Sequence, residues 1–266
     1  MARKIWRVVK VAVIVYVLFG VLLYFIQDQL LFHPQSLPKN HKFNFVQPFT
    51  ELNIPVPEGR NLSVVKFTVD SPVRGVVLYF HGNRQNVERY AKHAHQFTSN
   101  GYEVWTMDYP GFGKSTGKRS EQTIYNDAVL LYNMALHQTI PDNIIIYGKS
   151  MGTGVAAQLA SVRECRQLIL ETPYYSIDAL AKHYFPMYPV IPLTKYAFPT
   201  HKYLQNVKAP VTIFHGTNDE VIPYKQAKQL KSKHKHVQLI TIENGKHNNL
   251  NEIDHFSNNL NSLLQN

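Results

Sequence analysis

Apolar and polar positions divide the chain into an N-terminal apolar stretch and a longer part in which short apolar runs alternate with amphipathic ones. The N-terminal stretch, residues 11–26, contains no charged side chain. A membrane-spanning helix needs roughly 17–25 apolar residues, and residues 30–32 prolong the stretch beyond a short polar interruption. We therefore expect residues 1–32 to form a basic head followed by a transmembrane anchor.

The charge around this stretch predicts its orientation. The residues before it include Arg3, Lys4, Arg7 and Lys10. The positive-inside rule then predicts a cytoplasmic head, with the rest of the chain on the far side of the membrane, periplasmic or lumenal/extracellular. A cleaved secretory signal is one alternative, because the stretch is only slightly longer than the apolar region of a signal, and a buried helix is another. No small-x-small cleavage site follows the stretch, which favours a retained anchor.

Beyond the anchor, apolar runs with β-branched residues alternate with segments of helical spacing. We expect strands at residues 62–69, 76–80, 102–107, 144–147, 167–170, 211–214 and 237–242. We expect helices at residues 86–99, 120–137, 152–162, 224–233 and 249–264. This alternation predicts βαβ units, and hence an α/β fold with a mostly parallel central sheet flanked by helices.

Two proline-containing segments interrupt the alternation. Residues 33–54 carry three prolines and are predicted to be a linker with room for a first short strand, so that the α/β domain covers residues 55–266. Residues 174–206 carry four prolines and eight aromatic residues, and are too long for an ordinary connection. We expect them to form a small cap over the carboxyl ends of the strands, where open α/β sheets bind ligands. The alternative is a packed excursion that does not contact substrate.

Composition excludes several classes of protein. At 266 residues, with 44% hydrophobic and 17% charged residues, the chain fits one globular α/β domain with additions. The net charge of +10 comes partly from the head and partly from lysines in residues 225–235, whose helical spacing indicates a solvated helix face or attraction to an anionic membrane. No nucleic-acid motif accompanies this charge, so we expect no nucleic-acid partner. The single cysteine, Cys165, rules out an internal disulfide.

The most informative motif is G-K-S-M-G at residues 148–152, which follows a predicted strand and precedes a predicted helix. Strand, sharp turn and helix around G-x-S-x-G are typical of a nucleophile elbow, which exposes the serine hydroxyl at the end of its strand. Glycines flank Ser150 because a Cβ there would crowd the elements that the turn brings together. The backbone N–H of Met151 would then face a developing oxyanion. The alternative is a glycine-rich turn whose serine merely caps the helix.

A serine nucleophile needs a base and a carboxylate that orients the base. In this fold the order along the chain is serine, acid, histidine. Asp219 lies in the loop after the predicted strand 211–214, and His247 lies in the loop after the last predicted strand. Both loops leave the carboxyl ends of their strands, so the sequence predicts that Ser150, Asp219 and His247 meet at one edge of the sheet.

Other titratable residues compete for these roles. Glu220 adjoins Asp219 but is expected to point away, whereas Glu171, at the end of the strand after the elbow, is an alternative acid. His215 is expected to pack or to hydrogen-bond locally. The loop H-G-N at residues 81–83 is where this architecture supplies a second oxyanion donor, and we expect the backbone N–H of Asn83 in that role, with His81 buried and structural.

We expect neither a cofactor nor a metal. The two G-K-S triplets, at residues 113–115 and 148–150, lack the upstream glycine of a phosphate-binding loop. The histidine pairs at positions 93/95 and 234/236 have no carboxylate or cysteine partners at metal-ligand spacing.

Four tracts give the chain a family resemblance. They are H-G-N at 81–83, D-Y-P-G-F-G-K-S at 108–115, G-K-S-M-G-T-G at 148–154 and H-G-T-N-D-E at 215–220. From about residue 55 onward the chain resembles membrane-anchored, serine aminopeptidase-like members of the α/β-hydrolase superfamily, some of which are acyl-thioesterases. The resemblance implies the α/β-hydrolase fold, Ser150 as nucleophile, Asp219 as acid, His247 as base, and Asn83 and Met151 as oxyanion donors. One departure is Lys246, where the group usually has a small residue.

These inferences predict a membrane-anchored serine hydrolase that cleaves carboxylic esters or thioesters through an acyl-enzyme. The aromatic cap and the anchor favour substrates with acyl chains, and the expected partners are the lipid bilayer and a small-molecule or acylated substrate. A serine peptidase or aminopeptidase, and a non-catalytic membrane scaffold with the hydrolase fold, are the alternatives. The sequence does not predict an oligomeric state.

Overall fold

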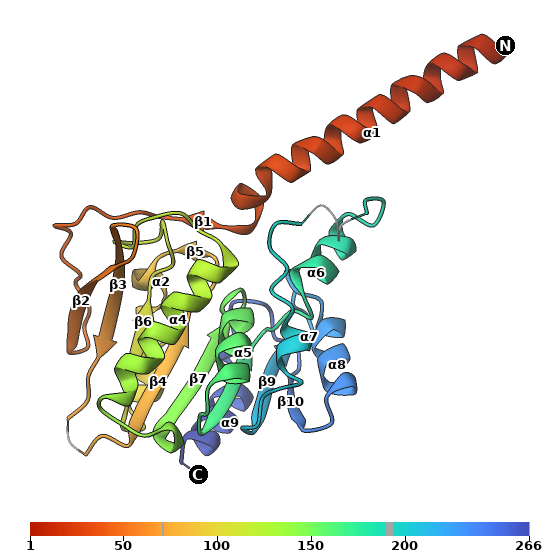
Figure 1. Cartoon of the computed structure of the whole chain (residues 1–266). Helices are drawn as coiled ribbons and strands as arrows, with labels where there is room; N and C mark the ends of the chain where they lie inside the picture. The colour runs from red at the N-terminus through yellow and green to blue at the C-terminus, as the bar shows by residue number, and fades with distance from the viewer. Residues whose placement is uncertain (71, 190–193, 266) are drawn as a thin grey trace.

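An eight-stranded sheet forms the centre of the protein, in a computed structural model that describes residues 1–70, 72–189 and 194–265. The strand order is β10-β9-β8-β7-β4-β6-β3-β2 (Figure 1). β3 pairs antiparallel with β2 and β6, and every other pair is parallel. The strands of this sheet are β2 (Phe49–Val56), β3 (Arg60–Phe67), β4 (Gly75–Phe80), β6 (Tyr102–Met107), β7 (Ile144–Lys149), β8 (Gln167–Glu171), β9 (Val211–Gly216) and β10 (Val237–Ile242).

Helices cover both faces of the sheet, as predicted (Figure 1). α4 (Glu121–Leu136), α5 (Gly152–Val162) and α8 (Tyr224–Lys233) pack on one face. α2 (Val87–Ala91), α3 (His95–Thr98) and α9 (Asp254–Gln265) pack on the other. The result is the α/β-hydrolase fold that the elbow motif and the family resemblance predict.

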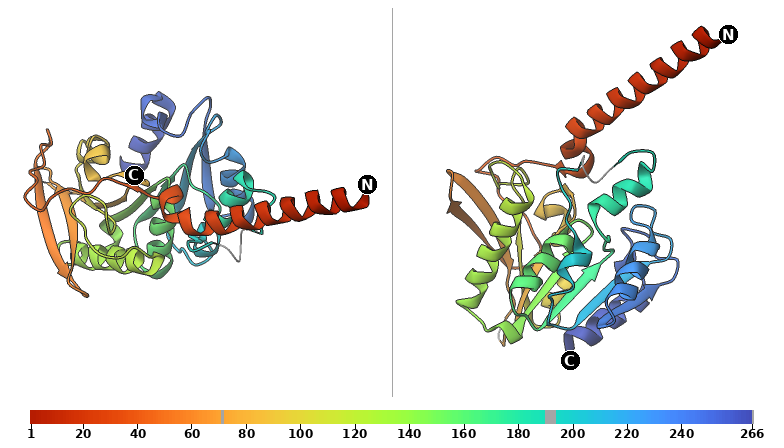
Figure 2. Two further views of the ribbon diagram at one scale, coloured as in Figure 1. Left: turned by 90° about the horizontal axis from the view of Figure 1, so that it is seen from above. Right: turned by 45° about the vertical axis from the view of Figure 1, so that its right-hand side comes forward.

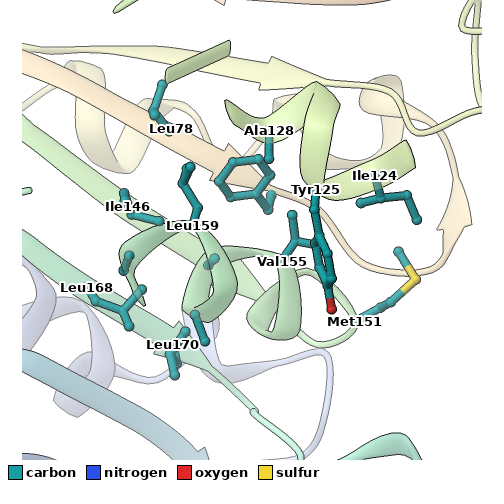
Figure 3. Packing of buried hydrophobic residues seen from close by; sticks show 14 of the residues in the cluster. Leu78, Ile124, Tyr125, Ala128, Ile146, Met151, Val155, Leu159, Leu168 and Leu170 are labelled. Atoms are coloured by element: carbon teal, nitrogen blue, oxygen red, sulfur yellow. The ribbon is translucent and has the colours of Figure 1, made fainter. Parts of the chain in front are cut away.

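The central strands are buried on both faces because helices cover each side of a parallel sheet. Along β4, Leu78 and Phe80 join the apolar cluster beneath α4 and α5, while Val77 and Tyr79 join the opposite cluster. Figure 3 shows side chains of α4 and α5 gathered over strand residues that include Leu78 and Ile146. A serine begins α4 as expected, since the Ser120 Oγ accepts a hydrogen bond from the N–H of Thr123 at 3.0 Å.

Two predicted elements differ from the structure. β2 (Phe49–Val56) crosses the expected boundary between linker and domain at residues 54 and 55, where the prediction had room for a short strand, and its antiparallel pairing with β3 extends that strand to eight residues. The helix expected over residues 86–99 is divided into α2 and α3, since i→i+3 backbone hydrogen bonds from His93 and Ala94 tighten the chain between them.

The N-terminal helix α1 runs from Ala2 to Leu31, well beyond the apolar stretch at its centre. Among the described residues, it is the one helix long and apolar enough to cross a membrane. It projects away from the domain, and its C-terminal end lies at the edge of the sheet where the parallel strands end (Figures 1 and 2). A two-residue strand, β1 (His33–Pro34), then pairs with β5 (Arg84–Gln85) in the loop after β4.

The predicted cap contains α6 (Ile177–Tyr184) and α7 (Thr200–Tyr203), while its residues 190–193 lie outside the described residues. The cap segment also contacts α1. The rings of Tyr16 and Tyr188 stack with their centroids 4.6 Å apart, and the Tyr196 hydroxyl donates to Asp28 Oδ1 at 2.6 Å. α1 and the predicted cap segment are therefore neighbours at the same edge of the sheet (Figure 2).

Candidate active site

Ser150 occupies a strained turn between β7 and α5. Its backbone φ is 52°, in the left-handed region that residues other than glycine rarely adopt. The Ser150 N–H donates to the carbonyl of Glu171 at 2.9 Å, which ties the turn to the end of the neighbouring strand β8. A strained backbone of this kind persists only where its surroundings hold it. The turn therefore has the geometry of a nucleophile elbow.

The glycines on either side of Ser150 are required by space. A Cβ on Gly148 would lie 2.5 Å from the carbonyl oxygen of Gly152. A Cβ on Gly152 would lie 2.0 Å from the carbonyl oxygen of Phe80, at the end of β4. Both distances are shorter than any van der Waals contact, so the close approach of β7, α5 and β4 depends on glycine at both positions.

The structure brings together the three residues that the sequence predicted as a triad. The Ser150 Oγ lies 2.9 Å from Nε2 of His247. The Nδ1 of His247 lies 2.8 Å from Oδ2 of Asp219. Asp219 follows β9 and His247 follows β10, so all three residues stand at the carboxyl ends of parallel strands. Their hydrogen-bonded order is the one in which a carboxylate orients a histidine toward a serine hydroxyl.

The surroundings of Asp219 keep its carboxylate ionised. Burial raises the pKa of Asp219, but hydrogen bonds from His215 and His247 and from the backbone of Ile222 together hold the pKa well below its ordinary value. The Asp219 Oδ1 also accepts from the N–H groups of Val221 and Ile222, both at 2.8 Å. A carboxylate held in this way is ready to stabilise a protonated imidazole next to it.

His215 is a site residue whose contact with Asp219 was not predicted. Its Nε2 lies 2.8 Å from the Ile222 carbonyl and 3.3 Å from Asp219 Oδ2. The expected local hydrogen bond is therefore present, and the ring also steadies the acid. His215 lies near the end of β9 and Asp219 in the loop beyond it, so no spacing rule in the sequence indicated this contact.

The two rival carboxylates have other partners. Glu171 is buried and forms an ion pair with Lys149, while the Tyr147 hydroxyl donates to it at 2.6 Å. Glu220 was expected to point away from Asp219. Its side chain is exposed, and its Oε2 lies 3.5 Å from the backbone N of His247, whereas the ring of His247 is paired with Asp219.

The buried pair Lys149–Glu171 lies directly beneath the elbow, where the two residues are partners across β7 and β8. Burial by itself raises the pKa of Glu171. The charge of Lys149 and hydrogen bonds from Lys149 and Tyr147 nevertheless lower this pKa below its ordinary value. The pair therefore places two compensated charges in the protein interior.

We expect Lys149→Met to lower the free energy of unfolding by about 3–5 kcal/mol, because Glu171 would be left as a buried charge without its partner. Chemical denaturation of the full chain in detergent measures the change. Lys246→Met is the matched control, since Lys246 is exposed and its replacement should change stability by less than about 0.5 kcal/mol. A loss below about 1 kcal/mol for Lys149→Met would contradict this account of the pair.

The two predicted oxyanion donors belong to different segments, Met151 to the elbow itself and Asn83 to the loop after β4. Met151 is the N-cap of α5, where the helix dipole favours negative charge. The Asn83 carbonyl accepts from the N–H of His33 at 2.8 Å, and its side-chain Nδ2 donates to the Leu31 carbonyl at 2.7 Å. The loop that carries Asn83 is thus fastened to the end of α1. The first residue of that loop, His81, is buried as expected, with Nδ1 2.7 Å from the Gly82 carbonyl.

The histidine pairs that were considered as metal ligands make other contacts. His93 Nδ1 accepts from the Asn251 side chain at 3.0 Å, and His234 Nε2 lies 2.9 Å from the His201 carbonyl. Burial is the main cause that lowers the pKa of His93 to about 4. Within the described ranges, no group of three or more His, Cys, Asp or Glu side chains has the arrangement of a metal site.

The chain matches the family described as serine aminopeptidase, S33, over residues 71–203, which is half of its 266 residues. It is 32% identical to the lysophosphatidylserine lipase ABHD12 of Danio rerio over 232 residues, covering 74% of this chain and 60% of that protein. It is 31% identical to the α/β hydrolase domain-containing protein 17C of Xenopus tropicalis over 183 residues, covering 66% of this chain and 57% of that protein. The chain thus spans roughly three fifths of the length of these relatives.

Solved structures share the fold. The Pyrococcus furiosus esterase Pf2001 superposes with a TM-score of 0.67 at 19% identity, over 88% of this chain and 97% of the esterase. A cold-adapted esterase from an Arctic intertidal metagenomic library superposes with a TM-score of 0.64 at 16% identity, over 87% of this chain and 99% of that one. Together with the family match over residues 71–203, this fold shows that the chain belongs to the serine aminopeptidase (S33) family of the α/β-hydrolase superfamily.

Proposed function

We propose that this protein is a membrane-anchored serine hydrolase that cleaves carboxylic esters or thioesters, with substrates that carry an acyl chain. The observation that carries the proposal is the hydrogen-bonded series Ser150–His247–Asp219 at a strained elbow. The similarity to a lipase supports ester hydrolysis. The apolar helix α1 supports association with a membrane.

In the proposed mechanism, Ser150 Oγ attacks the carbonyl carbon of the substrate while His247 Nε2 accepts the hydroxyl proton. Asp219 stabilises the imidazolium that forms. The N–H groups of Met151 and Asn83 donate to the oxyanion of the tetrahedral intermediate. His247 then gives its proton to the leaving alcohol or thiol, and an acyl-enzyme on Ser150 remains.

Deacylation repeats these steps with water as the nucleophile. His247 takes a proton from the water, hydroxide attacks the acyl carbonyl, and the same two N–H groups donate to the second oxyanion. Collapse of this intermediate releases the carboxylic acid and returns the proton to Ser150. Every step uses side chains and backbone groups of the chain itself.

Chain-length profiling of the full chain in detergent tests this proposal. We expect hydrolysis of p-nitrophenyl esters, with kcat/KM rising from acetate toward medium and long acyl chains, and turnover of acyl thioesters. Aminoacyl-amides serve as the contrasting substrates, because the family is described as aminopeptidases. Preferential cleavage of the amides would favour a peptidase, and a protein that neither turns over esters nor reacts with a fluorophosphonate would favour a scaffold.

The orientation in the membrane is a separate part of the proposal. The basic residues before the apolar part of α1 favour a cytoplasmic N-terminus and a hydrolase domain on the far side of the membrane. Sealed membrane vesicles with the cytoplasmic face outward test this orientation, because added protease is then expected to remove a tag at the N-terminus while the hydrolase domain stays protected. Digestion of the domain while the tag stays intact would contradict the orientation.

A further inference from the structure

A cavity of about 340 Å³ lies between the last turns of α1 and the cap helix α6. Its wall is predominantly apolar, and its volume falls within the range of small-molecule pockets, about 300–1,000 Å³. From the cap segment it is lined by residues that include Leu180, Ala181, Tyr184 and Tyr188. The opposite wall belongs to the predicted membrane anchor.

The wall contributed by α1 consists of one helical face. The α1 residues that line the cavity recur every three or four positions over about three turns, so their side chains lie on the same side of the helix. They are Gly20, Leu23, Tyr24, Gln27, Leu30 and Leu31. The anchor thus presents one continuous side to the cap, although an anchor that only tethers the domain would need no such contact.

Specific contacts hold the two walls together. Besides the Tyr16–Tyr188 stack and the Tyr196–Asp28 hydrogen bond, the N–H of Lys195 donates to Gln27 Oε1 at 2.8 Å. A Cβ added to Gly20 would approach the Tyr188 ring to 3.1 Å, so the glycine permits close packing there. The cavity therefore lies between two sets of direct contacts that join α1 to the cap segment, one at Tyr16 and one at Gln27 and Asp28.

The cavity reaches the candidate active site at two residues. Asn83, whose N–H is the proposed oxyanion donor, lines it, and so does Val221, whose N–H donates to Asp219. Ser150 and His247 do not line it. A molecule whose carbonyl lies at Ser150 would therefore extend a chain past Asn83 into the cavity.

We propose that this cavity binds the acyl chain of the substrate, with the membrane anchor α1 as one of its walls. The inference rests on the proposed function and specifies its substrate as one with a hydrocarbon chain that enters between α1 and α6. Because the α1 wall runs from Gly20, within the predicted membrane span, to Leu31 at the end of the helix, the acyl chain can pass from the bilayer to the site along one helix. Each methylene buried there should raise kcat/KM by about fourfold until the cavity is filled.

The test replaces small or aliphatic wall residues by tryptophan in the full chain, one from each side of the cavity. Ala181→Trp fills it from α6 and Leu23→Trp from α1. Lys182→Trp and Leu22→Trp are the matched controls, since both are exposed neighbours on the same helices and neither lines the cavity. The measured quantity is the ratio of kcat/KM for p-nitrophenyl dodecanoate to that for p-nitrophenyl acetate, below micelle-forming concentrations.

We expect the ratio to fall at least tenfold in Ala181→Trp and Leu23→Trp and to stay within about twofold of wild type in both controls. Labelling by a small fluorophosphonate checks that Ser150 is still reactive in each variant, and hence that the active site is folded. Ratios that remain at the wild-type value in both wall variants would overturn the cavity assignment while the proposed function stands. A wild type that hydrolyses neither ester would overturn the proposed function, and the cavity assignment with it.

A second measurement does not depend on the folding of variants. A fluorophosphonate with a twelve-carbon chain and a photoreactive diazirine at its far end is attached to the wild-type protein and then irradiated. Mass spectrometry is expected to find the crosslink within residues 20–31 or 177–188. Crosslinks confined to other segments would show that the acyl chain lies elsewhere.

Discussion

Replacing Ser150 by alanine is expected to lower kcat for ester hydrolysis by on the order of 10⁵–10⁶-fold and to abolish labelling by a fluorophosphonate. Alanine has no oxygen to attack the carbonyl, so no acyl-enzyme forms. Substrate binding and the oxyanion donors remain, which leaves only a small residual rate above the uncatalysed reaction. Rates with a p-nitrophenyl ester and gel-based labelling of the full chain measure both effects.

Ser161→Ala is the matched control for this replacement. Ser161 lies on α5, the helix that follows the elbow, and its hydroxyl donates to the Gln158 carbonyl at 2.6 Å, outside the site. Its removal is expected to leave the rate and the labelling close to wild type. If Ser150→Ala were labelled as strongly as wild type, the assignment of the nucleophile would be wrong.

Replacing Asp219 by asparagine is expected to lower kcat by about 10⁴-fold. The side-chain amide is nearly the same size, but its N–H₂ in place of Oδ2 would face Nδ1 of His247 and favour the wrong tautomer of the ring. The imidazolium would also lose the negative charge that stabilises it. The pH-independent rate with a p-nitrophenyl ester is the measurement, with thermal unfolding to confirm that the variant is folded.

Variants of two other carboxylates, Glu220 and Glu171, test whether the loss of kcat is specific to Asp219. Glu220→Gln changes the residue next to Asp219 and should lower kcat by less than tenfold, because its contact is with the backbone of His247. Glu171→Gln should act mainly on stability, since Glu171 is paired with Lys149. A larger loss of kcat in either glutamate variant than in Asp219→Asn would show that the acid has been misassigned.

The elements closest to the chemistry were predicted best from local sequence. α5 begins and ends at the residues expected, and β7 extends only two residues beyond its predicted end. Local rules suffice there because the glycines at 148 and 152 and the apolar run before them leave few conformations open. The chain order of Ser150, Asp219 and His247 likewise sufficed to predict that the three side chains meet, since parallel strands share one edge.

Contacts between distant segments were not predictable in the same way. The length of β2 depends on its antiparallel partner β3, so the sequence indicated room for a short strand there and no more. The contact of His215 with Asp219 depends on the turn of the loop after β9. The packing of α1 against the cap joins residues about 170 positions apart, such as Tyr16 and Tyr188, whose interaction leaves no periodic signal in either segment.

The sequence by itself determined the elbow at Ser150, the order of the acid and the base, the alternation of strands and helices, and the apolar helix that precedes them. Each of these follows from short-range rules of spacing and backbone conformation. Only the tertiary structure decided that α1 and the predicted cap segment enclose one cavity beside Asn83. The two walls of this cavity come from segments about 150 positions apart in the sequence, α1 and α6. The distance between them depends on how the sheet and its connections place both segments, which no local pattern encodes.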